Sequence, residues 1–209
     1  DVLKEGIPYF SSESNTKPGY PKYADLNGDG VIDSNDQTFI GRGDPIHIGG
    51  FNNTWTFYGV DLSVFFQWSY GNDILNANRP YFENGNKTKD LNMFKSYVNR
   101  WTPANPDSDI PCVSNSPSNR VFSSRVIEDG SYLRLKTISL GYTIPQDITR
   151  KAKIDKVHLS FSLNNVYTWT KYTGYDPEVS IRNSALTPGL DFSSYPRALT
   201  FMFNFNIAF

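Results

Sequence analysis

The last nine residues, 201–209, constrain most strongly what this chain can fold into. Every second position there is apolar: Phe201, Phe203, Phe205, Ile207 and Phe209. Because alternate side chains of a strand share one face, these five define an apolar face, and the residues between them are mostly polar or small. This alternation is typical of the last strand of a membrane barrel, although a soluble sheet can bury one face as well.

The composition favours β-structure and gives no reason to expect a nucleic-acid partner. The 20 basic and 21 acidic side chains leave a formal charge of −1, too small to attract a polyanion as the main partner. Aromatic residues make up 15% of the sequence, and strands favour them. No run of about 18 apolar residues is present, so no membrane-spanning helix is expected, whereas alternating strands need no such run.

Four further segments have strand patterns: residues 47–57, 60–70, 131–144 and 156–170. Tyr58 and Gly59 form a tight turn between the first two. Short connections at 58–59 and 145–155 alternate with long ones at 71–130 and 171–196, as strands that run up and down across a membrane require. We therefore expect the two long connections to be extracellular loops.

One helix is predicted inside the first long loop, over residues 90–101. Its apolar residues recur at helical spacing: Leu91, Phe94, Tyr97, Val98 and Trp101. The predicted fold is therefore all-β, with antiparallel up-and-down strands, long loops and one short helix. Five or six strands cannot close a barrel, because the smallest single-chain bacterial barrels have about eight strands and each edge in lipid must be paired. We expect residues 1–209 to be the C-terminal part of a larger transmembrane barrel.

An Asp-rich segment, 25–36, has the ligand spacing of a calcium-binding loop. The candidate ligands are Asp25, Asn27, Asp29, the Val31 carbonyl, Asp33 and Asp36. Gly30 stands where such loops turn sharply, but Asp36 replaces the usual bidentate Glu, and no convincing helices flank the segment. Two interpretations stay open: a structural Ca²⁺ that stiffens an exposed loop, or a turn that Asx side chains and glycines hold without an ion.

The sequence offers no catalytic constellation. His47 and His158 are the two histidines, which excludes a zinc triad within the chain. Cys112 is the single cysteine, and its loop carries no acid–base set that would activate a thiol. We expect no enzymatic activity, no catalytic residues and no cofactor other than the candidate Ca²⁺.

Five segments resemble, in order and spacing, the C-terminal end of the SusC/RagA family, the TonB-dependent outer-membrane transporters of Bacteroidetes. The matching residues are 25–41, 49–74, 125–145, 159–180 and 189–209, and the loop motif at 101–106 is similar as well. The resemblance covers nearly the whole chain from about residue 20 onward.

The resemblance implies a barrel of about 22 strands with a plugged lumen in the cell outer membrane. It also implies a SusD-like surface lipoprotein as partner, with uptake of oligosaccharides or peptides driven through TonB. The plug, the TonB-contacting segment and most strands lie outside these residues, so energy coupling does not carry over to this chain alone. The resemblance places no substrate-binding residues. The alternative is a soluble, calcium-dependent, carbohydrate-binding β-sandwich.

Overall fold

The computed structural model describes residues 7–83, 92–114, 117–179 and 188–209. The chain divides into two compact units. The first unit comprises residues 1–41, 75–127 and 190–193, and the second comprises residues 42–74, 128–189 and 194–209.

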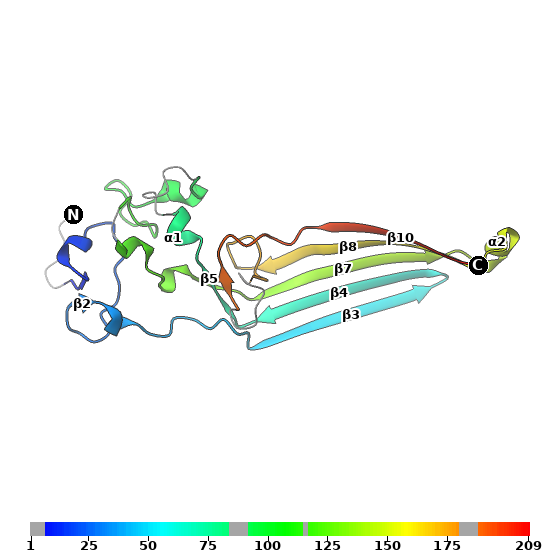
Figure 1. Cartoon of the computed structure of the whole chain (residues 1–209), viewed down its shortest axis with the longest axis horizontal. Coiled ribbons are helices and arrows are strands. Elements are labelled where there is room, and N and C mark those ends of the chain that lie inside the picture. The colour runs from blue at the N-terminus through cyan, green and yellow to red at the C-terminus, as the bar shows by residue number, and fades with distance from the viewer. Residues whose placement is uncertain (1–6, 84–91, 115–116, 180–187) are drawn as a thin grey trace. The chain divides into compact units, whose positions relative to one another are not determined.

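A five-stranded antiparallel sheet makes up most of the second unit (Figure 1). Its strands are β3 (His47–Phe57), β4 (Val60–Tyr70), β7 (Tyr132–Thr143), β8 (Lys156–Thr170) and β10 (Thr200–Ala208). They lie in the order β10-β8-β7-β4-β3, as an open sheet in the described part of the chain. The up-and-down antiparallel arrangement predicted from the alternation is confirmed, and each strand bound agrees with its prediction to within one residue.

A tight turn joins β3 to β4. Tyr58 and Gly59 both have positive φ, at 46° and 80°, as a type I′ hairpin turn requires. The Gly59 carbonyl accepts a hydrogen bond from the Thr143 N–H at 2.7 Å, and a Cβ at position 59 would lie 2.8 Å from the Thr143 oxygen. Glycine therefore suits this position for its conformation and for the space it leaves. The connection from β7 to β8 contains α2 (Gln146–Thr149) and the 3₁₀ turn Arg150–Ala152, at the same end of the sheet (Figure 1).

The first unit is built from short elements. They are β1 (Tyr9–Phe10), β2 (Val31–Ile32), α1 (Arg79–Phe82), β9 (Leu190–Asp191) and the 3₁₀ turns Glu13–Asn15, Ser34–Asp36, Lys95–Asn99, Pro117–Arg120 and Ser124–Val126. The strands β5 (Asp73–Asn76) and β6 (Ile127–Asp129) span the points where the chain passes from one unit to the other. Buried apolar side chains of this unit include Ile32, Ala77, Ile110 and Val126.

The helix predicted over residues 90–101 is wrong for the part that the structure describes. Asp90 and Leu91 lie outside the described residues, and the remainder forms only the 3₁₀ turn Lys95–Asn99. Phe94 stays extended and packs against Phe82, with ring centroids 5.2 Å apart. Tertiary packing of this aromatic pair thus overrides the helical spacing. None of the described helices has the length and apolarity needed to cross a membrane.

Candidate functional site

The register of the long sheet collects apolar side chains on one surface, which we call the apolar face. One row crosses all five strands: Trp55 lies opposite Leu62, Leu62 opposite Leu140, Leu140 opposite Phe161, and Phe161 opposite Phe203. Directly opposed residues share a face. By the same register the face also includes Phe51, Phe57, Val60, Val64, Phe66, Leu133, Leu135, Ile138, Leu159, Leu163, Phe201, Phe205 and Ile207.

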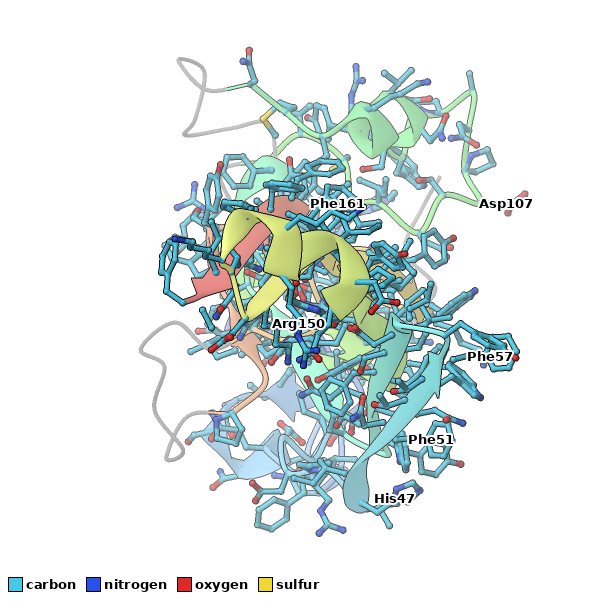
Figure 2. The ribbon with its side chains drawn as sticks, turned by 90° about the vertical axis from the view of Figure 1, so that its right-hand side faces the viewer. His47, Phe51, Phe57, Asp107, Arg150 and Phe161 are labelled. Carbon is cyan, nitrogen blue, oxygen red and sulfur yellow. The ribbon has the colours of Figure 1, made fainter. Side chains whose placement is uncertain are left out.

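The apolar face is uncovered in the described part of the chain. Phe201, Phe203 and Phe205 are 64%, 70% and 59% exposed, and the rings of Phe51 and Phe57 project away from the ribbon in Figure 2. A soluble β-sandwich would bury such a face against a second sheet. A large exposed apolar patch of this kind marks a surface that contacts a membrane or another protein.

Aromatic side chains with polar tips stand at both ends of the apolar face. Trp55, Tyr58 and Tyr142 lie toward the 58–59 turn, and Trp68, Tyr70, Tyr167 and Trp169 lie toward the other end. The strand β4 has 11 residues. At about 3.3 Å per residue it spans about 33 Å, and a tilt of about 45° projects this to about 23 Å. This height is close to the apolar band of about 25 Å on an outer-membrane barrel, which aromatic girdles flank.

The opposite surface, which we call the polar face, carries hydrogen-bonded side chains. Three pairs connect β7 to β8, each at 3.0 Å: Thr137 with Asn164, Ser139 with Ser162, and Thr143 with His158. Hydrogen-bonded polar pairs across neighbouring strands stabilise a sheet face that is in contact with water. The two faces therefore have opposite solvent preferences.

A cluster of charges on the polar face holds the segment that follows β8. Arg134 of β7, with a side chain only 3% exposed, pairs with Asp176 and donates from Nη1 to Glu178 Oε2 at 3.1 Å. The same Oε2 atom accepts from Lys136 Nζ at 3.1 Å, and it forms an ion pair with Arg197 Nε at 3.0 Å. We call these five residues the ion cluster.

A β-bulge interrupts β7 at Lys136. Phe65 pairs with Thr137 and the next residue, Phe66, pairs with Leu135, so Lys136 is the extra residue. A bulge re-aims the side chains around it. Arg134 and Lys136 share the polar face, as alternate residues of a strand do, and both contact the Glu178 carboxylate. The bulge shifts the alternation after them, so that Thr137 and Ser139 follow on the same face.

Asp176 ties three parts of the second unit together. Its carboxylate pairs with Arg134 and accepts the backbone N–H groups of Glu178 at 2.9 Å and Arg197 at 3.1 Å. Burial acts to raise the pKa of Asp176, but these hydrogen bonds and the charge of Arg134 outweigh it, so the pKa is lowered. The ion cluster was not predicted from the sequence. Two acidic residues shortly after a strand, within a segment that resembles a family motif, were the one available signal.

The Asp-rich loop is a chain of hydrogen-bonded turns. Asp25 accepts the N–H groups of Gly28 at 2.6 Å and Gly30 at 2.9 Å. Asp36 accepts those of Leu26 and Asp33, both at 2.8 Å, which lowers the pKa of its carboxyl group. Further Asx bonds continue the chain, from the N–H of Asp29 to Asn27, of Val31 to Asp29 and of Asn35 to Asp33. No group of three or more His, Cys, Asp or Glu side chains in the described residues is arranged to hold a metal ion.

Comparison with known proteins finds receptors and transporters. TonB-dependent receptor P3 of Formosa agariphila is 37% identical over 212 residues, covering 98% of this chain and 20% of that protein. TonB-dependent receptor SusC of Bacteroides thetaiotaomicron is 24% identical over 200 residues, covering 94% of this chain and 18% of that protein. No family model matches the chain.

Solved structures that are similar to this chain also belong to a transporter. The RagAB peptide importer in its closed-closed state superposes with a TM-score of 0.73 at 27% identity, over 91% of this chain and 21% of that chain. The RagAB peptide transporter gives a TM-score of 0.68 at 28% identity, over 80% of this chain and 17% of that chain.

The fold and its relatives define the chain as a segment of a TonB-dependent receptor. Within that class it belongs to the SusC/RagA family. The chain spans about a fifth of the length of the curated relatives it matches. These relatives are named as receptors and importers, not as enzymes.

Proposed function

We propose that the chain forms the C-terminal strands and outer loops of an outer-membrane nutrient importer. The apolar face meets lipid and the polar face lines the lumen. The observation that carries this proposal is the uncovered apolar row from Trp55 to Phe203 across all five strands. In hydrocarbon such a surface needs no covering layer, and the neighbouring strands of a larger barrel would pair the two free edges, β3 and β10.

The proposed cargo is an oligosaccharide or a peptide, and the proposed partner is a SusD-like surface lipoprotein. Support comes from the similarity to SusC and to RagAB, which is named as a peptide importer. TonB supplies the energy through parts of the whole protein that lie outside this chain. The long connections after β4 and β8 are the proposed extracellular loops.

A matched pair of lysine substitutions in the whole protein tests the membrane orientation. Phe203 and Asn204 are neighbours on β10, on opposite faces. Phe203→Lys places a charge in lipid and costs about 2–4 kcal/mol near the midplane, whereas Asn204→Lys places the same charge in water. The measurement is the free energy of unfolding in lipid vesicles. Equal losses for the two variants would refute the proposed orientation.

We also propose a structural Ca²⁺ for the Asp-rich loop, because its oxygen donors have the spacing of a calcium loop. Binding to the folded state alone raises stability by about 2.7 kcal/mol at a hundredfold excess over Kd. The test is the melting temperature of the protein with and without millimolar Ca²⁺. Asp29→Asn should abolish the rise, and Asp44→Asn, at an exposed position outside the loop, should preserve it. An unchanged wild-type melting temperature would leave the hydrogen-bonded turn as the whole role of the loop.

A further inference from the structure

A cavity of about 570 Å³ opens on the polar face beside the ion cluster. Its lining includes Phe65 and Gln67 of β4, Tyr132 of β7, and the ion-cluster residues Glu178 and Arg197. All five belong to the second unit. Because the cavity lies on the polar face, a solute in the proposed lumen would have access to it.

The ion cluster has an excess of positive charge. Three cations, Arg134, Lys136 and Arg197, face two anions, Asp176 and Glu178. A single oxygen of Glu178 already forms ion pairs with all three cations, so the negative charge of this lining residue is compensated. The charge that remains available to a ligand is positive.

Arg197 presents that charge to the cavity. Its side chain is 48% exposed, whereas that of Arg134 is 3% exposed. Its backbone N–H donates to Asp176, and its Nε forms an ion pair with Glu178 Oε2 at 3.0 Å. These two contacts hold the guanidinium group beside the cavity. Among the described residues, no hydrogen bond involves its Nη1 or Nη2 atom. A guanidinium whose Nη1 and Nη2 atoms have no hydrogen bond among the described residues can bind a planar carboxylate through that edge.

The rest of the lining suits the body of a polar solute. The ring of Phe65 lies close over Gly50, where an added Cβ would be 2.9 Å from a ring carbon. Beside it Gln67 Nε2 donates to the Tyr132 hydroxyl at 3.4 Å, which leaves the Gln67 carbonyl oxygen as an acceptor. An aromatic surface next to amide and hydroxyl groups can contact the C–H face and the polar groups of one solute.

We propose that this cavity is a cargo subsite for a carboxylate-bearing solute, with Arg197 as the residue that binds the carboxylate. The inference rests on the proposed importer function, since it requires the polar face to line the lumen. The carboxylate could belong to an acidic saccharide or to a peptide. The shared chemistry is the planar anion that the guanidinium holds.

Binding measurements on the purified whole protein in detergent test the subsite. The probes are trigalacturonate and triglutamate, with maltotriose and triserine as neutral counterparts of the same length. We expect at least one acidic probe to bind more tightly than its neutral counterpart, and Arg197→Gln to weaken it about tenfold, as loss of a charged hydrogen bond does. Arg197→Lys keeps the charge but cannot form two parallel hydrogen bonds to a carboxylate. Its affinity for the acidic probe should therefore fall between those of the wild type and Arg197→Gln.

The matched control is Arg150→Gln. Arg150 lies in the turn between β7 and β8 (Figure 2), is exposed, and bonds to Gln146 at 3.1 Å. This variant removes the same charge away from the cavity lining and should bind like the wild type. Which acidic probe binds identifies the source of the carboxylate. Equal affinity for acidic and neutral probes, equal affinity of wild type and Arg197→Gln, or no binding of any probe would each overturn the subsite. The lysine pair at positions 203 and 204 reports on the importer proposal independently.

Discussion

The two faces of the long sheet alternate residue by residue, yet they are organised differently. On the apolar face, apolar side chains lie opposite one another on each pair of neighbouring strands from β3 to β10. Its stabilisation is therefore distributed over many side chains. The polar face instead concentrates buried charge in the ion cluster, where Arg134 is 3% exposed. The apolar face therefore depends on the surroundings that meet it as a whole, whereas the polar face depends on a few specific ion pairs.

The largest effect we expect comes from removing the centre of the ion cluster. Arg134→Met leaves Asp176 buried without its cation, and breaking a buried pair from one side costs about 3–5 kcal/mol. The measurement is the free energy of unfolding of the whole protein in lipid vesicles. A loss below about 1 kcal/mol would show that the stabilisation of the polar face is spread over many side chains, as on the apolar face, and is not concentrated in the ion cluster.

Lys136→Met is the control for that substitution. Lys136 contacts the same Glu178 oxygen, but its side chain is 22% exposed and two other cations remain on that oxygen. We expect a loss within about 1 kcal/mol, as for a partly solvated pair. A larger loss of stability than that of Arg134→Met would show that Lys136, and not Arg134, contributes most to the stability of the ion cluster.

A smaller effect should appear in the pH dependence of stability. The folded-state pKa of Asp176 is lowered, below the unfolded value of about 3.9. Its contribution is therefore fully present above about pH 4 and is lost as pH falls through the folded-state pKa. The melting temperatures of the wild type and of Asp176→Asn should therefore converge as the pH falls through the folded-state pKa of Asp176. Curves that stay parallel down to pH 2 would argue against this carboxylate as the titrating group.

The strands of the sheet were predictable because their signal is local. Each of the five shows alternation with period two, and turn residues such as Tyr58–Gly59 mark the ends. The helix at 90–101 failed for the opposite reason. Helical spacing of Phe94 and Tyr97 is only a weak preference, and the contact of Phe94 with Phe82 overrode it.

The sequence by itself determined which side chains share a face along each regular stretch of strand, because strand geometry turns alternate positions to opposite sides without any knowledge of the neighbours. The shift of this alternation at the bulge in β7 was decided by the tertiary structure. The sequence also determined the spacing of the oxygen donors in the Asp-rich loop, because all of them lie within one short segment. Only the tertiary structure decided which neighbours meet. Arg134, Glu178 and Arg197 are far apart in the chain, and the return of the segment after β8 brings the two arginines to the Glu178 carboxylate.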